Sequence, residues 1–188
     1  MPRFFTDHEH AVVCACADRL VPPLGRHPGG AALGVADYVD HLLAAFTVDP
    51  PLIFAGGPFS GRFGGEASFA NFMPLSPNEE LAWRTRIEGS RGLAEREFNG
   101  ATRGWQQIYR EGIAALGADF CSAGADEQDR RLGEQRELRN TLYAHACEGA
   151  YGAPEYGGNH DLAGWRVIDW NGDVQPRGYT DDEVTRRA

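Results

Sequence analysis

Residues 35–46 read VADYVDHLLAAF, and this stretch decides the fold class of the chain. Its large apolar residues recur every three or four positions, which is the spacing of one face of an α-helix. The stretch therefore predicts an amphipathic helix that buries one side against other helices. The residues on that side are Val35, Tyr38, Val39, Leu42, Leu43 and Phe46.

Two capping boxes mark the starts of further helices. Thr6 is followed three residues later by Glu9, and Ser76 by Glu79, so that each hydroxyl can accept from a helical amide while each carboxylate reaches back. The first box predicts a helix to about residue 21, where two prolines end it. The second box, with Pro77 at the first helical position, predicts a helix to about residue 88.

Two more helices are expected in the second half of the chain. Thr102 can cap a helix that carries Trp105 and ends near Leu116. The charged stretch 126–139 predicts one solvated helix that continues to about residue 148, with His145 on its surface. The fold prediction is thus mostly α: a single-domain helical bundle of about five helices over residues 1–180, with long Gly/Pro/aromatic-rich loops, an irregular C-terminal segment, and residues 181–188 as a flexible tail.

Charge and composition exclude several classes of function. The chain has 188 residues and a formal net charge of -9, and all 18 of its basic residues are Arg. Its field repels phosphate backbones, which argues against nucleic-acid binding. The absence of Lys removes the P-loop lysine and the Schiff-base lysine. No run approaches the roughly 20 apolar residues of a membrane span.

Motifs for cofactors and catalysis are also missing. No two glycines stand in a Gly-x-Gly relation, so the dinucleotide fingerprint is absent. His145 and Glu148 lie one helical turn apart, which leaves a metal-dependent enzyme as one alternative. A stand-alone helical binding or regulatory module is another. We expect no catalytic, cofactor-binding or metal-binding residue in this chain.

Two segments are unusually aromatic for loops. Residues 49–78 interleave five Pro, five Gly and five Phe, and this loop either folds over its own core or contacts a partner. The block from Tyr156 to Trp170 combines a tight Gly-Gly-Asn turn with two tryptophans, which either cap this domain or face a partner. Both segments are our candidates for a partner interface, with Phe54, Phe59, Phe63, Phe69, Phe72, Tyr156, Gly157, Gly158, Asn159, Trp165 and Trp170 as its residues.

Several segments together resemble one family, the gluconate 2-dehydrogenase subunit 3 family. The most specific is the run 154–159, Pro-Glu-Tyr-Gly-Gly-Asn, followed by Gly-Trp at 164–165. The similarity extends over nearly the whole chain. Its other parts are Phe-Phe-Thr at 4–6, Pro-Gly-Gly-Ala at 28–31, Gly-Gly-Pro-Phe-Ser-Gly-Arg at 56–62 and Trp-Arg-Thr-Arg-Ile-Glu-Gly at 83–89.

The resemblance implies a small, cofactor-free subunit of a flavoprotein dehydrogenase complex. In that family a large subunit of the glucose-methanol-choline type holds FAD and oxidises a sugar, a sugar acid or a related alcohol. A cytochrome c subunit often carries the electrons onward. The small subunit assists the folding, stability and often the export of its large partner.

Location is a further expectation from the sequence. Many relatives begin with a twin-arginine signal, whereas residues 1–7 here show no such pattern. The four cysteines are sparse and form no disulfide framework, so we expect reduced thiols, Cys121 and Cys147 included. By sequence alone the chain is expected in the cytoplasm, and in the periplasm or outside the cell only if a signal-bearing partner exports it.

Overall fold

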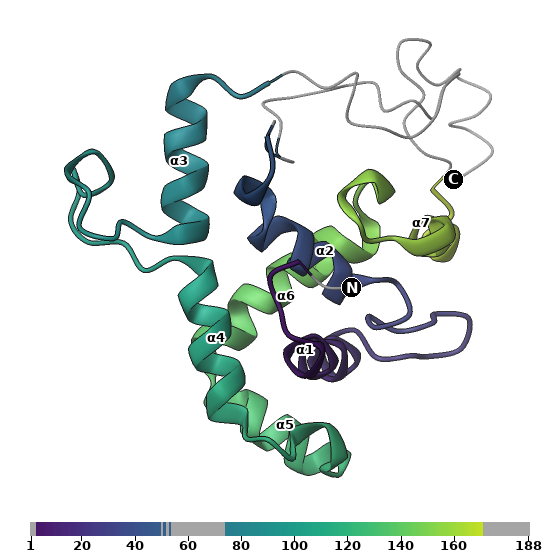
Figure 1. The fold of residues 1–188 in the computed structure, drawn as a ribbon. Helices are drawn as coiled ribbons and strands as arrows, with labels where there is room; N and C mark the ends of the chain where they lie inside the picture. Colours follow the sequence, from purple (N-terminus) through teal and green to yellow (C-terminus); the bar gives the residue numbers. More distant parts are fainter. Residues whose placement is uncertain (1–2, 50, 52, 54–73, 171–188) are drawn as a thin grey trace, which may run out of the picture.

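A computed structural model describes residues 3–49, 51, 53 and 74–170. This part of the chain contains seven α-helices and no β-strand, so the prediction of a mostly α fold is confirmed. None of the helices described is long and apolar enough to cross a membrane. The helices are α1 (Asp7–Leu20), α2 (Val35–Leu43), α3 (Pro77–Glu88), α4 (Trp105–Leu116), α5 (Ala125–Glu134), α6 (Arg136–Tyr151) and α7 (Ala163–Val167) (Figure 1).

Helix α6 is the centre of the arrangement. It contacts α1, α2, α4, α5 and α7, and it buries Leu138, Leu142 and Ala146 among them. The predicted helix at 35–46 is α2, which ends at Leu43 and is followed by a 3-10 turn at Ala45–Thr47. Its apolar face lies against α1 and α6, as the periodicity of the sequence indicates.

Both predicted capping boxes are present. The amide of Glu9 donates to Thr6 Oγ1 at 3.2 Å, and the amide of Thr6 donates to Glu9 Oε2 at 2.8 Å. The corresponding distances at Ser76 and Glu79 are 3.4 and 2.8 Å. The starts of α1 and α3 are therefore fixed by local sequence alone.

The start of α4 differs from the prediction. Its N-cap is Gly104, not Thr102. The backbone of Thr102 instead pairs with Ser90, so its segment is held in a loop connection. A Cβ atom at position 104 would lie 2.3 Å from the amide nitrogen of Gly89, so only glycine allows the two chain segments to approach this closely.

The charged stretch forms two helices, where one was predicted. The break is at Gln135, whose ψ of 61° is not helical, so α5 and α6 run in different directions. Local ion pairs could not reveal this break, because the turn follows from packing: α5 buries Leu132, while α6 places Leu138 against α4. This division and the short α7 raise the expected number of about five helices to seven.

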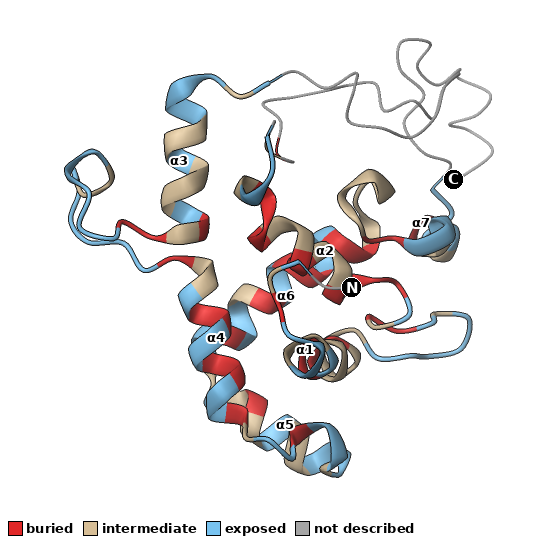
Figure 2. Cartoon of the chain, viewed as in Figure 1, coloured by how far each residue is buried: buried red, intermediate tan, exposed pale blue. Residues whose placement is uncertain are grey.

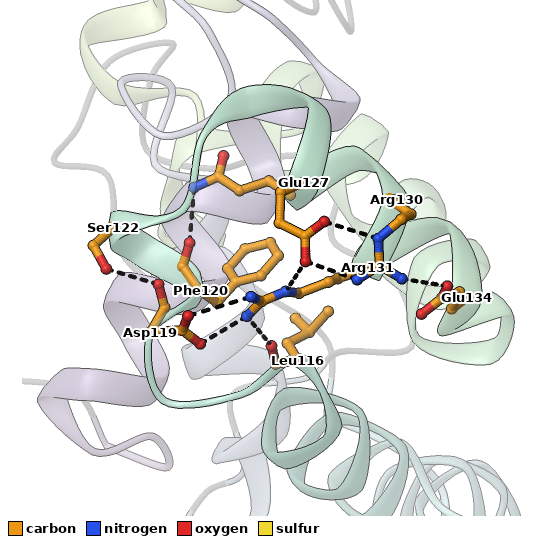
Figure 3. A network of polar contacts seen from close by, with 9 residues as sticks. Leu116, Asp119, Phe120, Ser122, Glu127, Arg130, Arg131 and Glu134 are labelled. Atoms are coloured by element: carbon orange, nitrogen blue, oxygen red, sulfur yellow. Dashed lines mark hydrogen bonds and ion pairs between the residues drawn. The ribbon is translucent and has the colours of Figure 1, made fainter.

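The junction between α4 and α5 is held by the guanidinium of Arg131 (Figure 3). It donates to the carbonyl of Leu116 at 3.1 Å, to Asp119 at 2.7 and 3.2 Å, and to Glu127 at 2.7 Å. Hydrogen bonds from Arg130 and Arg131 lower the pKa of Glu127 to about 2. The network caps the last turn of α4 and covers the fully buried Phe120.

A buried carboxylate holds the N-terminal segment on α2. Asp40 is 2% exposed and accepts hydrogen bonds from three successive backbone amides, those of Arg3 at 2.6 Å and of Phe4 and Phe5 at 2.9 Å. The ring of Phe5 is thereby placed in the core beside Tyr109. The sequence signal for this role is an acidic residue on the buried face of an amphipathic helix.

Candidate partner interface

The turn before α7 is built around the side chain of Asn159, which has no exposed surface. Its backbone amide donates to the carbonyl of Gly149 at 2.7 Å, and its Nδ2 donates to the carbonyl of Gly152 at 3.0 Å. Its Oδ1 accepts from the amide of Gly164 at 2.9 Å. One side chain thus caps the C-terminal end of α6 and the N-terminal end of α7.

Glycines in this turn allow the segment to lie directly on the last turn of α6. A Cβ at Gly158 would be 2.1 Å from the carbonyl oxygen of Gly149, and a Cβ at Gly164 would be 1.9 Å from that of Ala150. Either side chain would force the two segments apart. The predicted tight turn is confirmed, and φ is positive at two of its residues, with 98° at Gly157 and 46° at Asn159.

The two tryptophans of the block differ in their surroundings. Trp165 is only 7% exposed, and its Nε1 donates to the carbonyl of Tyr151 at 2.7 Å. It therefore caps this chain's own helices. Trp170 is 39% exposed, so its ring remains accessible. Any effect of Asn159 or Trp165 on a partner would act through the shape of the turn.

Exposed apolar side chains flank both ends of α7. Leu162 is 38% exposed and Ile168 is 53% exposed, in addition to Trp170. We call these three residues the α7 face. The sequence analysis did not single out Leu162 or Ile168. The signal that could have found them is apolar side chains that directly flank a helix too short to cover much of the core.

Asp37 connects the block to the first two helices. His10 of α1 and Asp37 of α2 approach to 2.8 Å, and His160 of the turn lies 3.2 Å from the other carboxylate oxygen. The sequence did not reveal this cluster, because its members are far apart in the chain. It fixes the position of the turn relative to α1 and α2.

The candidate residues of the aromatic loop, Phe54, Phe59, Phe63, Phe69 and Phe72, lie outside the described residues. Their part in a partner interface stays a prediction.

Residues 7–172 of the chain match the family model for gluconate 2-dehydrogenase subunit 3. The chain belongs to this family. No curated protein and no solved structure gives a match. The family model includes the whole turn at 157–165, so the resemblance that rested chiefly on the Gly-Gly-Asn and Gly-Trp residues is confirmed.

His145 is not on the helix surface, contrary to our expectation. It is 2% exposed, and burial lowers its pKa from 6.5 to about 4. Its ring is stacked with Tyr109 and lies edge-on to Trp105 at 4.6 Å between centroids, and its Nδ1 is hydrogen-bonded to the Tyr109 hydroxyl at 3.0 Å. Its position follows from the packing of this side of α6 on α4.

Glu148, the second residue of the metal alternative, has a different contact. Its Oε2 accepts from the hydroxyl of Tyr38 at 2.7 Å, which ties α6 to α2. Among the residues that the structure describes, no group of three or more His, Cys, Asp or Glu could hold a metal ion. The described part of the chain is a helical framework with accessible apolar side chains at its edges.

Proposed function

We propose that this chain is the non-catalytic small subunit that binds, folds and stabilises a large FAD-dependent dehydrogenase of the glucose-methanol-choline type. The large subunit would oxidise a sugar, a sugar acid or a related alcohol. The observation that carries the proposal is the family match over residues 7–172, because a subunit of a dehydrogenase complex needs a partner that holds the redox chemistry.

This assignment gives each subunit of the complex a different role. FAD and the catalytic residues belong to the large subunit, and a cytochrome c subunit would take the electrons onward. The small subunit contributes a binding surface for the large subunit. Its α7 face presents apolar side chains on a segment that is hydrogen-bonded to the end of α6. A fixed apolar surface suits binding, because little conformational entropy is lost when a partner covers it.

The first test is to produce the chain with and without the FAD-dependent dehydrogenase from the same genome. The isolated chain should show no flavin absorbance and no turnover of sugars or alcohols. The dehydrogenase should accumulate in soluble, flavin-bound form only when the small subunit is present. Flavin bound to the isolated chain together with turnover would contradict the non-catalytic role, and equal yields of dehydrogenase without the chain would contradict the role in folding and stability.

Replacing Trp170 by alanine should weaken the complex. Truncation of a large aromatic anchor in an interface typically reduces the free energy of binding by about 2 kcal/mol, which is roughly thirtyfold in affinity. Titration of the purified dehydrogenase with each variant measures the change. Tyr143→Ala is the control, because Tyr143 is an aromatic residue of α6 that is 55% exposed and is not one of the three residues of the α7 face. Equal affinities of both variants would remove the α7 face from the interface.

A further inference from the structure

The loop between α3 and α4, residues 89–104, carries the most exposed of the large apolar side chains that the structure describes. Phe98 is 93% exposed, and Leu93 on the same loop is 40% exposed. In Figure 1 the loop and α3 lie on the side of the fold opposite to α7. Figure 2 shows that α3 is mostly half-buried or exposed, with a buried residue at its C-terminal end. This region is therefore a second accessible surface, separate from the α7 face.

Hydrogen bonds fix the shape of the loop. Ser90 is 3% exposed; its amide donates to the carbonyl of Thr102 at 2.9 Å, and its hydroxyl donates to Glu97 Oε1 at 2.8 Å. The same carboxylate oxygen accepts from the amide of Gly92 at 3.1 Å. At the base of the loop, Arg96 pairs with Glu88 at 2.8 Å. Phe98 thus projects from a loop whose backbone is held in place by these hydrogen bonds and this ion pair.

A groove of about 460 Å³ runs between α3 and this loop. Leu81 and Ala82 of α3 and Phe98 of the loop contribute apolar surface to it, and most of its other lining residues are polar or charged. Two exposed charged residues, Arg86 and Glu95, also line the groove. Among the described residues neither has an ion-pair partner, whereas the neighbouring Arg84 pairs with both Glu80 and Glu88.

We propose that this surface, formed by α3 and residues 89–104, joins two copies of the chain in a two-fold symmetric dimer. A two-fold interface must be complementary to itself, because the same patch is used by both subunits. This patch carries the projecting ring of Phe98, a groove with a mixed polar and apolar lining, and the charges of Arg86 and Glu95, which have no ion-pair partner among the described residues. Across a two-fold axis Phe98 of each copy enters the groove of the other, and each Arg86 meets the Glu95 of the other copy.

The acidic character of the chain does not prevent this contact. Each copy has a net charge of -9, but repulsion between exposed charges is screened beyond about 8 Å at physiological ionic strength. The attraction between Arg86 of one copy and Glu95 of the other then contributes more to the free energy of dimerisation than the screened repulsion. The α7 face stays accessible on the other side, so, if the proposed function holds, two dehydrogenase subunits would be joined through a pair of small subunits.

Sedimentation of the isolated full-length chain over a range of concentrations at physiological salt tests the dimer without reference to the dehydrogenase. The wild type should dimerise, and Phe98→Ala should raise the dissociation constant at least about thirtyfold, as expected for a central aromatic anchor. Leu24→Ala is the control: Leu24 is 79% exposed but lies outside this surface, so its dimer should be unchanged. A wild-type chain that stays monomeric, or a Phe98→Ala dimer of unchanged strength, would overturn the proposal.

A charge exchange tests the two-fold geometry itself. Arg86→Glu and Glu95→Arg should each weaken the dimer about tenfold or more by placing like charges opposite each other. The double variant should regain most of the affinity, because the pairs re-form with reversed sign. Failure of the double variant to recover would show that these residues do not face each other. Loss of dehydrogenase binding in Phe98→Ala would instead assign this surface to the dehydrogenase and overturn the dimer.

Discussion

Replacing Asn159 by alanine should destabilise the chain by about 4 kcal/mol, because each buried group left without its hydrogen bond costs about 1–3 kcal/mol. The buried amide of Gly164 and the half-buried carbonyl of Gly152 would both lose their partner. Alanine would also have to adopt the left-handed conformation at φ of 46°, which adds about 1 kcal/mol. Against a typical total of about 5–15 kcal/mol, this is a large share of the stability of the domain.

Denaturant unfolding measures this loss, with Asn140→Ala as the matched control. Asn140 is exposed on α6, so its replacement should change the free energy of unfolding by less than about 0.5 kcal/mol. Hydrogen exchange should show where the damage lies, since the amides of α7 lose protection when the turn opens. Two variants of equal stability would mean that Asn159 does not hold α7 to α6.

Acid should destabilise the fold through His145. The folded chain holds this imidazole neutral down to about pH 4, whereas the unfolded chain protonates it near 6.5. Between these pH values the imidazole binds a proton in the unfolded state but not in the folded state. The free energy of unfolding therefore falls as the pH falls. The contribution is fully present above pH 6.5 and amounts to about 3 kcal/mol lost by pH 4.

The pH dependence of unfolding in His145→Gln isolates this effect. Glutamine retains hydrogen-bonding capacity toward Tyr109 but does not titrate, so the difference between wild type and variant should shrink toward pH 4. His8→Gln removes an exposed histidine and should leave the wild-type pH profile intact. A profile that is the same in His145→Gln and in the wild type would show that His145 is not the titrating group.

The features that the sequence predicted correctly are those governed by neighbours in the chain. The capping boxes at Thr6 and Ser76 and the apolar periodicity of α2 need no tertiary information, and each was found as expected. The break at Gln135 and the glycine cap at Gly104 depend on contacts with distant segments. No local pattern reveals them.

The turn at 157–159 was predictable from the sequence, but the surroundings of its side chains were not. The composition of the block around Gly157-Gly158-Asn159 indicated a special turn, and the turn is present. The sequence could not tell that Asn159 and Trp165 point into the protein while Leu162 and Ile168 remain accessible. That distinction depends on how the turn docks on α6. His145 was misplaced because its side of α6 packs on Trp105 and Tyr109 of α4, a contact between distant segments that no local pattern reveals.

The way α7 is fastened has a consequence for the order of folding. The turn and Trp165 bond to carbonyls of Gly149, Tyr151 and Gly152, which take up these positions only after α6 has completed its last turn. We therefore expect α7 to dock after the helical core has formed. Contacts absent from the transition state affect mainly the unfolding rate, so loss of the Asn159 side chain should speed unfolding far more than it slows refolding. The α7 segment would then determine the unfolding rate of the subunit, while the helical core would determine its folding rate.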